Sequence, residues 1–162
     1  MFAWESAVTG VELAGPPWGT DEMHISSDIA LFVNQFWRAT RDNSASWLND
    51  TAWPLASGIA EFWMSKLAID NPGAAAGSPL SVLRVMGPDE YHTGVNNSAY
   101  TNAGVIQSLR TAVLIAQQLG LSRDVYAAWE AAASAIIMPW DPVRLYHPEC
   151  VYVVCLLLVS VR

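Results

Sequence analysis

A helical repeat of apolar residues between positions 99 and 116 limits the fold of this chain more than any other feature. Apolar side chains recur there at spacings of three and four residues, which places them on one face of an α-helix. Gly120 is suited to end this helix, because glycine readily adopts the left-handed conformation found after helix C-termini. The residues in the pattern are Ala99, Ala103, Ile106, Leu109, Val113 and Ala116.

Three further segments show helical periodicity. The first spans 27–41 and predicts a helix with one buried face. The second follows a polar break at 40–46, has Pro54 near its start and gives way at Asp70. The third would be capped by Ser122. Because short turns separate the segments, we expect an all-α fold of antiparallel helical hairpins. The apolar positions are Ile29, Phe32, Val33, Phe36 and Trp37, then Leu55, Ile59, Phe62, Trp63 and Leu67, then Val125, Trp129, Ala132 and Ile136.

The composition supports a folded chain and excludes some partners. Hydrophobic residues make up 52% of the sequence and charged residues 14%, so a large core can be buried. The net charge of −7 and the lack of a basic patch argue against nucleic acid as a partner. The first residues lack the basic and apolar regions of a signal peptide. The compartment stays open, with the cytoplasm as the default.

A short polar segment from Val85 to Asn102 concentrates the side chains that could do chemistry. An apolar, β-like run at 79–86 leads into it. A solvated loop is one interpretation, because Asn, Asp, Gly and Pro favour turns for backbone reasons alone. A carbohydrate site is the other, because Asn, His and Tyr supply both donors and acceptors for sugar hydroxyls. A glycosidic bond also needs a carboxyl that holds its proton, and Glu90 could supply it if it were buried. The polar residues are Asp89, Glu90, Tyr91, His92, Asn96, Asn97, Tyr100 and Asn102.

Two strings in this segment, G-P-D-E-Y-H at 87–92 and V-N-N-x-x-Y-T-N at 95–102, resemble the catalytic-acid loop of glycoside hydrolase family 65. That family includes disaccharide phosphorylases, acid trehalases and a glucosidase acting on the glucosyl-galactosyl-hydroxylysine of collagen. The resemblance implies that Glu90 is the general acid and that His92 and Asn97 contact substrate. It also implies that residues 1–149 are part of a catalytic (α/α)6 toroid, which is incomplete in this chain.

Two earlier segments resemble the same family. The string F-A-W-E-S-A-V-T-G-V-E at 2–12 is similar to a stretch that begins an inner helix of the toroid and contacts the glucosyl unit. Trp4 and Glu5 are therefore expected to bind substrate. The string E-M-H-I-S-S-D-I-A at 22–30 makes His24 a candidate sugar contact, with a purely structural histidine as the alternative.

Neither a metal nor a cofactor is expected. Glu22 and His24 would project to the same side of an extended backbone. No third and fourth ligand follows at a suitable spacing, so we do not expect a metal site.

The last residues, 150–162, form an atypical apolar tail that departs from the family. The apolar run has roughly ten residues, whereas a membrane-spanning helix needs about twenty, so no membrane contact is expected. Cys150 and Cys155 both lie here and define no disulfide framework.

The family resemblance implies hydrolysis of an α-glucosidic bond with inversion, which needs a second carboxyl as base. In the family this base lies well C-terminal of the acid, and we find no counterpart after Glu149. We therefore expect this chain alone to be weakly active or inactive. An acid trehalase and a disaccharide phosphorylase are alternatives, as is a non-catalytic helical fragment that only binds sugar or a partner. The oligomeric state stays open.

Overall fold

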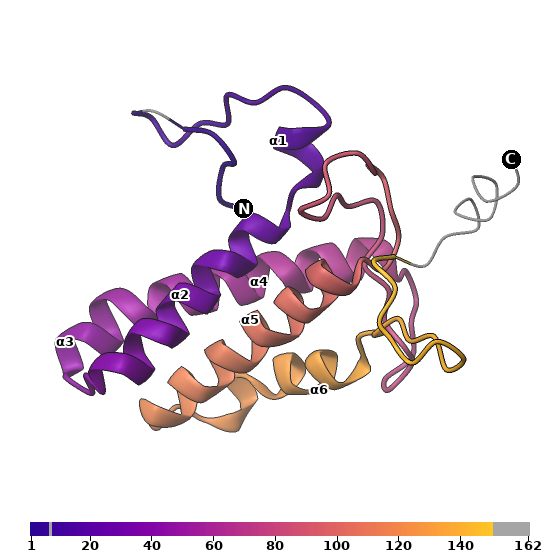
Figure 1. The fold of residues 1–162 in the computed structure, drawn as a ribbon. Helices are drawn as coiled ribbons and strands as arrows, with labels where there is room; N and C mark the ends of the chain where they lie inside the picture. Colours follow the sequence, from indigo (N-terminus) through magenta and orange to yellow (C-terminus); the bar gives the residue numbers. More distant parts are fainter. Residues whose placement is uncertain (7, 151–162) are drawn as a thin grey trace, which may run out of the picture.

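The computed structural model describes residues 1–6 and 8–150, and its helices are joined by loops (Figure 1). The described residues form no β-strand, which confirms the all-α class. None of the helices in these ranges is both long and apolar enough to cross a membrane. The apolar tail is outside the described residues from position 151 onward. The elements are α1 (Trp18–Asp21), α2 (His24–Thr40), α3 (Ala45–Trp47), the π-helical turn η1 (Leu48–Ala52), α4 (Trp53–Asp70), α5 (Ala99–Gln118), the 3₁₀ turn η2 (Arg123–Val125) and α6 (Ala127–Ala135).

Helix α5 is the centre of the fold and confirms the strongest sequence prediction. It packs against α2, α4 and α6 and is buried on most of its sides. Ser98 caps its start by accepting a hydrogen bond from the Thr101 N–H, and Gly120 follows its end with a φ of 70°. Its solvent-free residues include Val105, Leu109, Ala112, Ile115 and Ala116.

The helices form two antiparallel hairpins, α2 with α4 and α5 with α6 (Figure 1). The end of α6 returns to the start of α5, because the Asn102 side chain donates a hydrogen bond to the Ile137 carbonyl. The N-terminal ends of α2 and α5 lie side by side, with the rings of His24 and Tyr100 edge to face at 5.3 Å. Loops that leave these ends therefore meet at one end of the bundle.

The prediction that α2 buries one whole apolar face is wrong in part. Val33 is buried, but Phe32 and Phe36 are 65% and 49% exposed. The reason is that α4 and α5 cover only the side of α2 that carries Ala30 and Val33. Phe36 packs instead against the ring of Trp47 on α3, with the ring centroids 4.6 Å apart, and stays partly exposed.

The cap assigned to Ser122 is also corrected. Its hydroxyl accepts a hydrogen bond from the Asp124 N–H and so caps η2, whereas α6 begins later, at Ala127. Tyr126, which precedes α6, provides no side-chain cap. The periodicity predicts the first turn of a longer helix after Ser122, but these residues form the 3₁₀ turn η2.

The apolar run before the polar loop does not form a strand. The N–H groups in the middle of the run are taken by side chains. Val82 donates to the Asn97 Oδ1 at 3.0 Å, and Leu83 donates to the Asp70 carboxylate at 2.9 Å. Arg84 has a φ of 52°, which interrupts an extended backbone. A strand needs a continuous backbone partner. Here backbone pairing is limited to isolated bridges at Leu80 and Val85, and polar side chains replace it between them.

Candidate active site

The loop that carries Glu90 is fixed at its base and along one side. Val85 and Val95 exchange two backbone hydrogen bonds, of 2.9 and 2.8 Å, which close the loop. The N–H of Met86 donates to the Asp21 carbonyl at 2.8 Å, and the Thr93 hydroxyl donates to the Asp21 carboxylate at 2.7 Å. The loop therefore stands against the end of α1, as Figure 1 shows.

The tip of the loop is organised by Asp89. Its carboxylate lies 2.6 Å from the Nδ1 of His92 and accepts the N–H of Tyr91 at 3.1 Å. The hydrogen bond from His92 is the main cause of a lowered pKa of Asp89, and the Tyr91 N–H adds to it. Asp89 is thus an acceptor that holds the turn, and Glu90 lies within this turn.

Glu90 itself is exposed. The burial that would keep a general acid protonated is therefore not supplied by the described residues. The structure does give Glu90 a defined backbone position, because Asp89 and His92 are bonded to each other across it. Its role as acid stays a prediction.

Asn97 and His24 have structural contacts. Asn97 is 7% exposed, and its side-chain oxygen accepts hydrogen bonds from the Val82 N–H and the Asn102 amide. His24 is 4% exposed, and its Nδ1 lies 3.1 Å from the Met86 carbonyl. Both side chains hold the polar loop to the helices. Protein groups thus already engage a polar atom of each side chain, and their predicted contacts to sugar stay predictions.

Trp4 and Glu5 lie in an exposed loop, so the expected helix start in residues 2–12 is wrong. The backbone N–H groups of Trp4, Glu5 and Ala14 all donate to the Glu12 carboxylate. Partial desolvation of Glu12 acts against ionisation, but these hydrogen bonds outweigh it and lower its pKa. The Glu12 carboxylate thus accepts N–H groups that would otherwise form the backbone hydrogen bonds of a helix.

Glu22 is the residue to which sequence reasoning gave no role. It ends α1 with a φ of −78° and a ψ of 54°, and His24 begins α2, so the extended backbone expected here is not present. Burial is the main cause of a raised pKa of Glu22, followed by the negative charges of Glu90 and Glu12. The N-terminal segment and the Glu90 loop thus approach the same carboxyl. The E-x-H string signalled the position but not its burial.

Glu149, although distant in sequence, also contacts the loop that carries Glu90. Its carbonyl accepts the N–H of Ala99 at 2.7 Å, and its carboxyl interacts with Asp89. Desolvation and then the charge of Asp89 raise the pKa of Glu149.

The described residues place no group of three or more His, Cys, Asp or Glu side chains where they could hold a metal ion.

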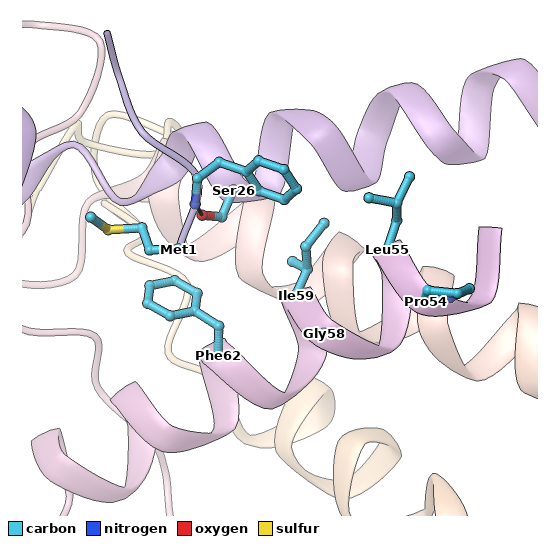
Figure 2. A pocket seen from close by; sticks show the side chains of 8 residues that line it. Met1, Ser26, Pro54, Leu55, Gly58, Ile59 and Phe62 are labelled. Carbon is cyan, nitrogen blue, oxygen red and sulfur yellow. Dashed lines mark hydrogen bonds between the residues drawn. The ribbon is translucent and has the colours of Figure 1, made fainter. Parts of the chain in front are cut away.

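A hollow of about 230 Å³ lies between α2 and α4 and is separate from this loop (Figure 2). Its lining is mostly apolar, and the N–H of Phe2 donates to the Ser26 hydroxyl at its edge. The ring of Phe62 faces the hollow from α4 (Figure 2). None of its lining residues belongs to the 85–97 loop, so we do not assign the glycosidic site to it.

Residues 1–149 match the model of the glycosyl hydrolase family 65 central catalytic domain. The chain belongs to glycoside hydrolase family 65. It is 39% identical over 149 residues to a protein-glucosylgalactosylhydroxylysine glucosidase of Mus musculus, covering 91% of this chain and 21% of that protein. It is 36% identical over 152 residues to the protein of the same name from Dictyostelium discoideum, covering 92% and 20%. This chain thus spans about a fifth of the length of these family 65 relatives.

The fold agrees with family 65 as well. A solved structure described as a kojibiose phosphorylase from the human microbiome superposes with a TM-score of 0.67 at 17% identity, covering 86% of this chain and 22% of that one. This likeness concerns the fold alone. It confirms the expectation of part of an (α/α)6 toroid, built in this chain from the α2–α4 and α5–α6 hairpins.

Proposed function

We propose that this chain carries the general-acid side of an α-glucosidase site, with Glu90 as the proton donor to the departing glycosidic oxygen. The observation that carries the proposal is the position of Glu90 on a loop closed by Val85 and Val95 and fixed against Asp21. A general acid must be held within reach of the bond that it protonates, and a closed loop limits its motion.

The substrate proposed is the glucosyl-galactosyl-hydroxylysine of collagen or a glucoside of similar linkage. The names of the relatives from Mus musculus and Dictyostelium discoideum support it. We propose hydrolysis with inversion, in which a second carboxyl activates water on the opposite face of the sugar. We do not assign that base to a residue of this chain.

The remaining predicted contacts divide by their accessibility. His92, Trp4 and Glu5 are exposed and can reach a ligand. We propose them as substrate contacts, with Trp4 presenting its ring to the apolar face of the sugar. His24 and Asn97 are proposed to act indirectly, by holding the loop through Met86 and Val82.

The test places residues 1–149 in the matching region of the Mus musculus relative, because the chain alone is expected to be weakly active or inactive. Wild type and Glu90→Gln are then compared on glucosylgalactosyl-hydroxylysine, kojibiose and trehalose by measuring released glucose. Loss of a positioned proton donor is expected to lower the rate by about 10²–10⁴-fold. The exposed Glu61 on α4 provides a matched control, and Glu61→Gln should keep the wild-type rate. A Glu90→Gln protein with an unchanged rate contradicts the proposal.

Two further readouts separate the alternatives. NMR of the first product should show β-glucose if the bond is cleaved with inversion. A disaccharide phosphorylase, the alternative within the family, would instead require inorganic phosphate and release glucose 1-phosphate. Binding of sugar without either product would indicate a non-catalytic fragment.

A further inference from the structure

Glu22 has a buried carboxyl oxygen without a partner. The residue is 4% exposed, and its Oε1 has no hydrogen-bond partner among the described residues. A buried polar atom without a partner is costly, typically by about 1–3 kcal/mol. At a candidate site, a ligand can supply the missing partner.

The surroundings of Glu22 indicate what kind of ligand it would take. The charges of Glu90 and Glu12 act on its carboxyl from two separate loops. Burial and these two charges raise the pKa of Glu22, so its carboxyl holds a proton more readily than an exposed one. A protonated carboxyl both donates and accepts hydrogen bonds, as a sugar hydroxyl does.

A cation suits the position less well. Glu12 is already engaged by three backbone N–H groups, those of Trp4, Glu5 and Ala14. Within residues 1–6 and 8–150, no three His, Cys, Asp or Glu side chains are arranged to hold a metal ion. The chemistry therefore favours a neutral, hydroxyl-bearing ligand.

We propose that Glu22 is a sugar-binding residue, whose carboxyl hydrogen-bonds a hydroxyl group of the glucosyl unit beside Glu90. The inference rests on the proposed function, because it takes its ligand from that reaction. It adds a second carboxyl to the site, with a binding role distinct from that of the acid. Glu22 reaches the sugar from the end of α1, and Glu90 reaches it from the loop that Asp21 supports.

The test uses calorimetric titration of D-glucose into the 162-residue chain and two variants of similar side-chain length. Glu22→Met removes every hydrogen-bonding atom and should weaken glucose binding by about 10- to 100-fold, the effect of one hydrogen bond lost in a buried site. Glu22→Gln keeps a donor and an acceptor and should bind within about threefold of wild type. Glu61→Gln should bind as wild type does. A folded Glu22→Met protein with wild-type affinity, or a wild type that does not bind D-glucose, overturns the inference.

Two further measurements keep the result decisive. If Glu22→Met loses its helical circular dichroism, infrared difference spectra of wild type and Glu22→Gln replace it. At or below pH 4.5, where its raised pKa keeps Glu22 mostly protonated, D-glucose should shift a protonated-carboxyl band that Glu22→Gln lacks. An unshifted band overturns the inference. D-glucose binding through Glu22, together with an unchanged rate for Glu90→Gln, contradicts the proposed function alone. A protein that cleaves glucosides but binds D-glucose equally well as Glu22→Met contradicts this inference alone.

Discussion

The side-chain amide of Asn102 donates a hydrogen bond to the side-chain oxygen of Asn97, at 3.1 Å, and both residues are buried. Asn102 also donates to the Ile137 carbonyl at 2.6 Å, and Asn97 accepts the N–H of Val82. This pair joins the start of α5, the segment after α6 and the run before the polar loop. Two asparagines of the family motif thus hold the loop in place.

Replacing Asn97 should destabilise the protein far more than replacing its neighbour. Asn97→Ala leaves the buried Val82 N–H without a partner and puts alanine at a φ of 51°, so we expect a loss of about 2–3 kcal/mol in the free energy of unfolding. Asn96 is exposed, and Asn96→Ala should cost less than about 1 kcal/mol. Urea unfolding followed by tryptophan fluorescence measures both. Equal losses would contradict the structural role of Asn97.

Two helical glycines should respond in opposite directions to alanine. A Cβ at Gly104 would lie 2.8 Å from the Cβ of Ser27, where α5 meets α2. We expect Gly104→Ala to destabilise by about 1–3 kcal/mol, because the added methyl overpacks this contact. A Cβ at Gly58 on α4 meets no atom within 4 Å, so Gly58→Ala should stabilise by about 0.5–1 kcal/mol. Thermal unfolding of the two variants checks the signs, and a stabilising Gly104→Ala would show that the helices are not in close contact there.

Trp63 should be the most costly aromatic residue to truncate. It is completely buried within the α4 side of the core, so Trp63→Ala is expected to lose about 3–5 kcal/mol. Phe32 on α2 is 65% exposed, and Phe32→Ala should change stability by no more than about 0.5 kcal/mol. Denaturant midpoints of the two variants give the comparison. Similar midpoints would mean that the packing of α4 is not as described.

The stability of the protein should depend on pH through Glu22. Burial, and then the charges of Glu90 and Glu12, raise the pKa of Glu22 above its ordinary value of 4.5. The folded state therefore binds this proton more tightly than the unfolded chain does. The resulting stabilisation is complete below pH 4.5 and is lost as the pH rises through the folded-state pKa.

Glu22→Gln removes this titration. Relative to wild type, the variant should gain stability as the pH is raised from below 4.5 to neutral. Melting temperatures across this range give the measurement, and Glu61→Gln controls for the loss of one carboxyl. A melting-temperature difference between Glu22→Gln and wild type that stays constant with pH would contradict the raised pKa.

Much of the helical architecture follows from local sequence. The spacing from Ala99 to Ala116 and the glycine at 120 together predict α5, and the structure agrees on both. Ser98 caps the helix in the structure. The same reasoning gave α4 its start near Pro54 and its end at Asp70. These predictions succeed because periodicity, capping and turn residues act within one element.

Where the local pattern failed, a polar side chain that accepts backbone N–H groups decided the outcome. The apolar run before the polar loop has the composition of a strand, but Asn97 and Asp70 take its N–H groups. The segment around Trp4 has the pattern of a helix start, but Glu12 takes its N–H groups. In both cases a polar side chain outcompetes regular backbone pairing.

The sequence by itself determined the all-α class, the main helices and the loop that presents Glu90. Only the tertiary structure decided which polar residues of that loop are exposed. It also decided that Glu22 is buried and that the charges of Glu90 and Glu12 raise its pKa. The physical reason is that burial and charge proximity depend on segments brought together by packing. The residue pattern specifies which groups are present, whereas the packing of α1, α2 and α5 sets their surroundings.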